Sequence, residues 1–162
     1  MTIIELLVVV VVIGIVSAVV IPELSNEEDS QLRAAAEALA ADVAYAQLLA
    51  IQSGGEGVAV VFDPTHNIYH LAMASDTDTP ITHPVNRTDY EVNYGAGAAH
   101  SLAAVRLLDA DVGDDGVLVL GSYGDPDQST NAVITLGAGR RRCTVTFEPV
   151  TGEPIISEVW IE

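Results

Sequence analysis

The apolar positions divide the chain into two unequal parts. Residues 6–21 are all apolar except for one glycine and one serine. A helix over residues 1–22 would be about 30 Å long at about 1.5 Å per residue, which matches the hydrocarbon core of a bilayer. Beyond Pro22 the apolar positions alternate with polar ones. We therefore expect a hydrophobic N-terminal helix within residues 1–30, followed by a globular domain over residues 31–162.

The first segment of the expected domain has the period of an amphipathic helix. Between residues 31 and 53, apolar side chains recur at spacings of four and three, which places them on one face of a helix. They are Leu32, Ala36, Leu39, Val43, Ala46 and Ala50. Gly54 and Gly55 then end the helix with a flexible exit. This face can serve either the core or a partner surface, and we expect it in the core.

The rest of the domain has the pattern of short strands separated by polar turns. The expected strands are residues 58–63, 68–74, 90–94, 104–108, 117–120, 132–136, 143–148 and 155–161, and the last two form a hairpin. Residues 75–86 are polar and contain prolines, so we expect them to form the longest loop. A long helix packed on antiparallel strands is an α+β fold.

The hydrophobic helix contains its own weak stretch. Residues 8–12 are an unbroken run of valine, which a helix in water tolerates poorly because β-branched side chains lose rotamer freedom there. In lipid or in a bundle, the cost of unsatisfied backbone groups enforces the helix. Gly14 adds backbone freedom, and Pro22 has no N–H to donate. We expect local loss of helix over residues 14–22, with a simple proline kink as the alternative.

The net charge is strongly negative. The chain has 23 acidic and 6 basic residues, a formal net charge of −17, and all the basic residues are arginines. Such a surface repels nucleic acid and anionic lipid headgroups, so we expect no nucleic-acid partner. Both a strongly solvated surface and a saline or calcium-rich habitat are consistent with this charge.

The N-terminal segment lacks the basic residues of a secretory signal. Residues 1–28 contain no arginine or lysine, while Glu5 stands just before the apolar run. This fits a chain whose basic leader has been removed and whose acidic side is external. A carboxylate at the edge of hydrocarbon is costly and is therefore a functional candidate. Glu5 either lies in the zone of lipid headgroups or pairs with the α-amino group of Met1, in the same chain or in another copy.

Residues 1–10, Met-Thr-Ile-Ile-Glu-Leu-Leu-Val-Val-Val, resemble the mature N-terminus of type IV pilins and of type II secretion pseudopilins. The resemblance implies that a prepilin peptidase cleaves the precursor before Met1 and methylates the new amine. It also implies that Glu5 neutralises the N-terminus of a neighbouring subunit in a helical filament. Gly14 and Pro22 match the pair that weakens the helix in this family. Met1 is less usual here than phenylalanine, and as an initiator methionine it would carry neither modification.

Parts of the domain are similar to the GspH/FimT branch of the same family. The similar segments are residues 39–47, 58–63 and 145–147, together with Thr151 and Gly152. This diffuse similarity implies the type IV pilin fold, in which the long helix packs on an antiparallel sheet. It suggests a minor pseudopilin as one alternative and leaves a major subunit open.

An acidic segment is a candidate calcium site. Residues 109–116 place Asp109, Asp111, Asp114 and Asp115 around two glycines, and calcium prefers several oxygen ligands on a tight loop. The segment lacks the bidentate glutamate of an EF-hand, and a solvated acidic turn is the alternative. We expect no other cofactor.

The single basic cluster, Arg140, Arg141 and Arg142, can pair with carboxylates of an adjacent subunit or remain solvated. Nucleic-acid binding is a third use, which the net charge opposes. Asn86 begins an acceptor motif for N-glycosylation and is expected at the surface. Cys143 is the only cysteine, so no disulfide forms within the chain, and its strand pattern places it in the core.

No motif of a catalytic site occurs in the sequence, and we expect no enzymatic activity. The leading hypothesis is a structural subunit of an extracellular type IV pilus-like filament, with an inner-membrane pool before assembly. Its partners would be other copies, prepilin peptidase and the pilus assembly machinery. The second hypothesis is a minor pseudopilin of a type II secretion system. The third is a membrane-anchored binding domain that never polymerises.

Overall fold

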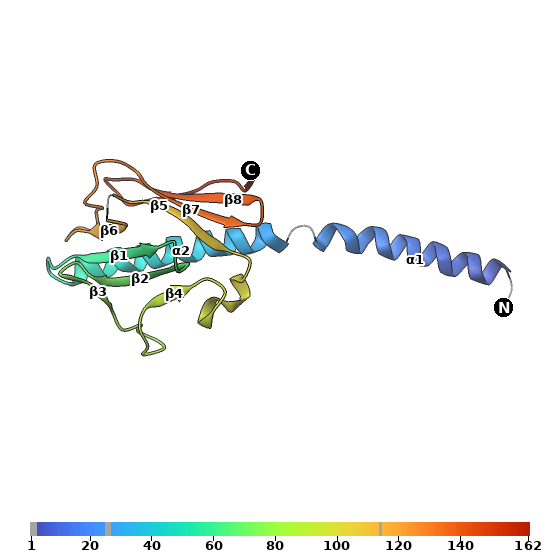
Figure 1. Cartoon of the computed structure of the whole chain (residues 1–162), viewed down its shortest axis with the longest axis horizontal. Coiled ribbons are helices and arrows are strands. Elements are labelled where there is room, and N and C mark those ends of the chain that lie inside the picture. Colours follow the sequence, from blue (N-terminus) through green and yellow to red (C-terminus); the bar gives the residue numbers. More distant parts are fainter. Residues whose placement is uncertain (1–2, 25–26, 114) are drawn as a thin grey trace.

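A long apolar helix extends from one end of a globular α+β domain (Figure 1). The computed structural model describes residues 3–24, 27–113 and 115–162, and for residues 14–24 it describes the helix without the side chains. Helix α1 runs over Ile3–Leu24, 22 residues, and is long and apolar enough to span a membrane. From Ile3 to Ile13 its apolar side chains are 50% to 90% exposed. The domain therefore does not cover this helix.

Helix α1 is continuous across the stretch that was expected to lose its helical structure. Residues 14–22 are helical in the single chain. The predicted local loss of helix is therefore wrong for the chain in isolation. The physical reason is the position of Pro22 in the last turn of α1. Its missing N–H removes one hydrogen bond close to a helix end, where the ladder of bonds is already incomplete. The conformation of this stretch in a filament stays a prediction.

Helix α2 runs over Glu27–Gln52 and begins four residues before the expected start. Its first turn holds Glu27, Glu28 and Asp29, and negative charge at the N-terminus of a helix interacts favourably with the helix dipole. The helix ends as expected, where Ser53 N–H donates to the carbonyl of Leu49 and Gly54 adopts a positive φ of 70°.

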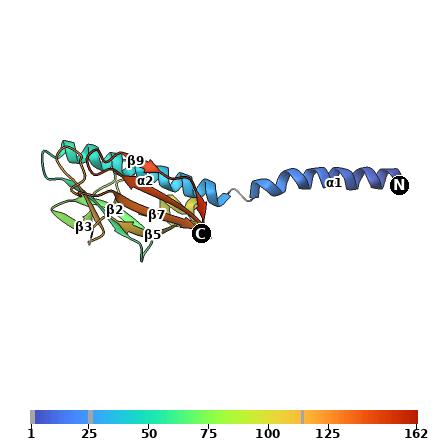
Figure 2. The same ribbon diagram turned by 90° about the horizontal axis from the view of Figure 1, so that it is seen from above.

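Helix α2 is the core helix of the domain. By length and composition it could cross a membrane. However, one face is buried in the domain, which confirms the interpretation of the apolar stripe as core (Figure 2). The buried residues are Leu32, Ala35, Ala36, Leu39, Ala40, Val43, Ala46 and Ala50. Because most of them are alanine, the strands β1, β7 and β8 can approach the helix closely.

Two five-stranded antiparallel sheets complete the domain. In the first sheet the order is β3-β2-β1-β6, and β4 also pairs with β2. Its strands are β1 (Val58–Asp63), β2 (Ile68–Met73), β3 (Asp76–Pro80), β4 (Glu91–Asn93) and β6 (Val117–Leu120). In the second sheet the order is β10-β8-β7-β5, and β9 also pairs with β8. Its strands are β5 (Arg106–Asp111), β7 (Ala132–Ala138), β8 (Arg141–Phe147), β9 (Pro154–Ile156) and β10 (Trp160–Ile161).

The inward faces of both sheets and the apolar face of α2 form one hydrophobic core. Strand β8 illustrates the alternation, because Cys143, Val145 and Phe147 are buried while the residues between them are partly exposed. The expected place of Cys143 in the core is therefore confirmed. The hairpin of β8 with β9 is also present.

Three elements differ from the sequence predictions. Residues 75–86 are not one loop, because β3 pairs with β2 at the edge of the first sheet. The expected strand over residues 155–161 is divided into β9 and β10. A short 3₁₀ helix, η1 (Gly97–Leu102), was not predicted. Polar edge strands and short 3₁₀ turns have little apolar periodicity, so their sequences give a weak signal.

Candidate assembly site

Glu5 lies in the first turn of α1, with apolar side chains exposed along the helix on its C-terminal side. A carboxylate in this position is stabilised by the positive end of the helix dipole. Met1, the expected partner of Glu5 across a subunit contact, lies outside the described residues. Gly14 and Pro22, the other two expected assembly residues, both lie within the continuous backbone of α1.

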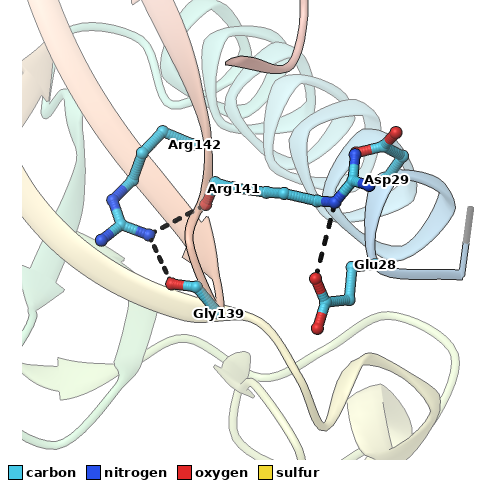
Figure 3. Close-up of polar contacts among 5 residues, drawn as sticks. All are labelled: Glu28, Asp29, Gly139, Arg141 and Arg142. Carbon is cyan, nitrogen blue, oxygen red and sulfur yellow. Dashed lines mark hydrogen bonds and ion pairs between the residues drawn. The ribbon is translucent and has the colours of Figure 1, made fainter. Parts of the chain in front are cut away.

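The first turn of α2 is tied to the second sheet by one arginine. Arg141 in β8 pairs with two of the three acidic residues of this turn, Glu28 and Asp29 (Figure 3). Its Nε lies 3.5 Å from Oε2 of Glu28, and its Nη1 donates to Oδ1 of Asp29. The side chain of Arg141 is 24% exposed and that of Asp29 is 30% exposed, so water screens the pair only in part. The bridge therefore anchors the end of the domain nearest to α1.

The other two arginines of the basic cluster hold the C-terminus. Arg142 donates from Nε to Oε2 of Glu162 at 2.8 Å and from Nη1 to the carbonyl of Gly139 at 2.8 Å. Arg140 donates from Nε to the carbonyl of Glu162 at 3.1 Å. All three arginines thus have acceptors within their own chain. Their expected role between subunits stays a prediction.

Sequence reasoning missed the contacts within the chain. Arg141 and Asp29 are 112 positions apart, and no local pattern links them. The only signal is the sign of the charges, since the first turn of α2 is acidic and the start of β8 is basic.

Replacing Arg141 by glutamine is expected to lower the free energy of unfolding by about 1 kcal/mol, since a partly exposed ion pair contributes about that much. The loss should concentrate in the first turn of α2, where amide hydrogens should exchange faster. Both effects can be measured by urea unfolding and hydrogen exchange of the full chain in detergent. Arg87→Gln in an exposed turn is the matched control. Equal exchange in the two variants would contradict a role for the bridge.

The expected calcium residues that the structure describes are divided between a strand and the turn that follows it. Asp109 and Asp111 lie on the exposed edge strand β5, and Asp115 accepts a hydrogen bond from the backbone N–H of Val117 at 3.2 Å. Asp114 lies outside the described residues. Within residues 3–24, 27–113 and 115–162, no three acidic, histidine or cysteine side chains are grouped so that they could hold a metal ion. Because Asp114 lies outside these residues, the calcium site stays a prediction.

Asn86 is exposed in a turn, which confirms its expected place at the surface.

The histidines make local contacts. His66 Nδ1 lies 2.6 Å from Oδ2 of Asp63, and this hydrogen bond holds the pKa of the carboxyl below its usual range. His70 Nε2 lies 2.9 Å from the carbonyl oxygen of Thr77.

One carboxylate is placed among tyrosines, which sequence reasoning did not find. Asp42 on α2 accepts hydrogen bonds from the hydroxyl of Tyr69 at 2.6 Å and from that of Tyr90 at 3.0 Å. Burial, with a further contribution from the nearby Asp42 charge, raises the pKa of Tyr69, Tyr90 and Tyr94 well above the usual range. Burial also raises the pKa of the Cys143 thiol. All three tyrosines are therefore neutral, and Tyr69 and Tyr90 act as hydrogen-bond donors to Asp42.

Stability is expected to fall as the pH rises above about 10. In the unfolded chain tyrosine loses its proton near pH 10, whereas in the folded chain the three buried tyrosines keep theirs to higher pH. The unfolded state then binds fewer protons, so the contribution is fully present below pH 10 and is lost above it. Urea unfolding at about pH 9 and about pH 11 measures this, and Tyr90→Phe should reduce the difference. The chain has no lysine, which simplifies the measurement. The same stability at both pH values would contradict the assignment.

No protein-family model matches the chain, and searches of curated proteins and of solved structures find no match.

Proposed function

We propose that this chain is a structural subunit of an extracellular type IV pilus-like filament, with the type IV pilin fold. The observation that carries the proposal is the exposure of α1. Its apolar side chains are at least half exposed from Ile3 to Ile13, while the domain has a complete core without them. An exposed apolar surface of this size needs lipid or the same surface of other copies to cover it.

The exposed helix α1 could lie first in the membrane and later in the interior of a filament. Before assembly, α1 is long enough to cross the inner membrane. In the filament, the α1 helices of many copies would bury one another, and the acidic domains would coat the outside. Glu5 would then neutralise the terminal amine of a neighbouring copy, because a carboxylate taken out of water is stable only with such compensation. The net charge of −17 would keep the outer surface solvated.

A minor pseudopilin of a type II secretion system is the second candidate. One observation favours it: the segments that resemble the GspH/FimT branch meet in the core of the domain. Residues 39–47 lie in α2, residues 58–63 form β1, and residues 145–147 lie in β8. Helix α2 contacts both of these strands.

The test is to shear filaments from cells, identify their dominant protein and measure the mass of its N-terminal peptide. The pilin proposal expects this chain to dominate and to begin at Met1 with one extra methyl group. Filaments that contain only traces of this chain, methylated in the same way, would favour a minor subunit. An unmethylated chain that is missing from filaments would overturn the assembly proposal.

A further inference from the structure

A cavity of about 540 Å³ lies between α2 and the segment that contains β4 and η1. On the α2 side it is lined by Ala34, Ala38 and Asp42, which are spaced four residues apart and therefore lie on one face of the helix. The two alanines end at Cβ and leave room above the helix. Asp42 is thus the one charged side chain that α2 contributes to the cavity.

Asp42 retains capacity to bind a further donor. An ionised carboxylate accepts about four hydrogen bonds, and the hydroxyls of Tyr69 and Tyr90 supply two of them. The ion pairs found among the described residues do not include Asp42. A partly buried carboxylate without a counter-ion is unfavourable, and it attracts a cation into the space beside it.

The Tyr94 hydroxyl is a second, independent indication of a missing ligand atom. Tyr94 is 2% exposed and lines the cavity. Its hydroxyl is buried and makes no hydrogen bond of good geometry in the part of the chain that the structure describes. The nearby Tyr69 hydroxyl can offer it only an acceptor, because the Tyr69 proton is donated to Asp42. Its ring lies 5.9 Å from that of Tyr69, which binds Asp42. A buried hydroxyl is normally hydrogen-bonded, so this one points to a polar atom that is supplied from outside the protein.

The lining selects a positively charged ligand. A second cavity of about 440 Å³ shares Asp42 and Glu91 with the first and adds Asp89 and Tyr90. Three carboxylates line the two cavities, Asp42, Asp89 and Glu91, and the one basic side chain that the structure places in either lining is the His83 imidazole. The ring of Tyr90 stacks on Tyr45 and on His83, with centroids 5.6 Å and 4.5 Å apart. Aromatic rings beside carboxylates favour organic cations over metal ions, which need more oxygen ligands.

We propose that this cavity binds a small organic cation, an alkylammonium or a guanidinium group, with the Asp42 carboxylate as its counter-ion. The hydroxyls of Tyr69 and Tyr90 hold the carboxylate in place, and the Tyr94 hydroxyl accepts a hydrogen bond as the bound cation settles beside it. The site is separate from α1 and does not depend on filament assembly. The cation is either a free amine or the lysine or arginine side chain of a partner.

The test is isothermal titration of the full chain in neutral detergent micelles with 1,4-diaminobutane and with n-butylguanidinium. The titrations are made in physiological salt, because salt screens the general attraction of cations to an acidic protein. Saturable binding of one equivalent is expected. Asp42→Asn should weaken it about tenfold or more, since it removes the charge while keeping an acceptor for the tyrosines. Asp109→Asn, on the exposed strand β5, is the matched control and should bind like the original chain.

Two further variants test the proposal if Asp42→Asn fails to fold. Ala38→Phe on the exposed surface of α2 should occupy the part of the cavity one helical turn from Asp42 and weaken binding with every charge intact. Tyr94→Phe should weaken binding without changing the charge. If n-butanol binds as well as the cations, if Asp109→Asn loses as much affinity as Asp42→Asn, or if no saturable binding occurs, the proposal is overturned. Equal affinity for a short arginine peptide amide would identify a partner side chain as the ligand, and binding of the free amines alone would identify a small molecule.

Discussion

Replacing Glu5 by glutamine is expected to remove the chain from filaments while the globular domain stays folded. Glutamine keeps the size and polarity of the side chain and removes only its charge. Without that charge, the terminal amine of a neighbouring subunit would be buried in the filament core with no compensation. A loss of about 1.4 kcal/mol at one subunit contact weakens association about tenfold, and the loss recurs at every contact in the polymer. The amount of chain in sheared filaments, compared with the amount in membranes, measures the effect.

The matched control is Glu37→Gln. Glu37 is an exposed acidic residue on α2, so its replacement makes the same change in net charge outside α1. Filaments of this variant should form normally. If Glu5→Gln assembles as well as Glu37→Gln, the carboxylate at position five has no role in assembly and belongs to the headgroup zone instead.

Replacing Leu39 by alanine should have the largest effect on stability. Leu39 is fully buried in the core that α2 forms with both sheets. Removal of a buried leucine side chain to Cβ loses the free energy of its transfer from water and leaves a cavity, which together cost about 2–5 kcal/mol. Urea unfolding of the full chain in detergent, followed by the fluorescence of the single tryptophan, measures the change.

Leu48 on the same helix provides the comparison. Its side chain is 50% exposed, so Leu48→Ala removes the same atoms from a position that is half in water. We expect a loss of less than about 1 kcal/mol, since most exposed substitutions change stability little. Similar losses for the two variants would mean that the buried face of α2 is assigned incorrectly.

Apolar periodicity predicted the elements that build the core. The run of apolar residues before Pro22 predicted α1, and the stripe from Leu32 to Ala50 predicted the buried face of α2. The strands β1 and β6 have the predicted bounds, because their buried residues alternate or form short apolar runs between turn residues. These signals are strong because burial of apolar surface dominates the folding free energy.

Polar contacts between distant segments could not be predicted in this way. The pairing of Arg141 with Asp29 and the hydrogen bonds of Tyr69 and Tyr90 to Asp42 each join residues 27 or more positions apart. Their partners are chosen by the tertiary fold and have no fixed spacing. Asp109 and Asp111 were expected in an acidic loop but lie at the end of β5, where they pair with β7. Local composition could not show that the second sheet continues into this segment.

The most direct test of the central claim is a structure of filaments sheared from cells, determined by electron cryomicroscopy. If α1 drives assembly, its helices will be bundled in the filament interior, with the Glu5 carboxylate within ion-pair distance of the N-terminal amine of a neighbouring subunit. The acidic domains will form the outer surface. Filaments built from another protein, or copies of this chain that contact one another only through their domains, would contradict the account.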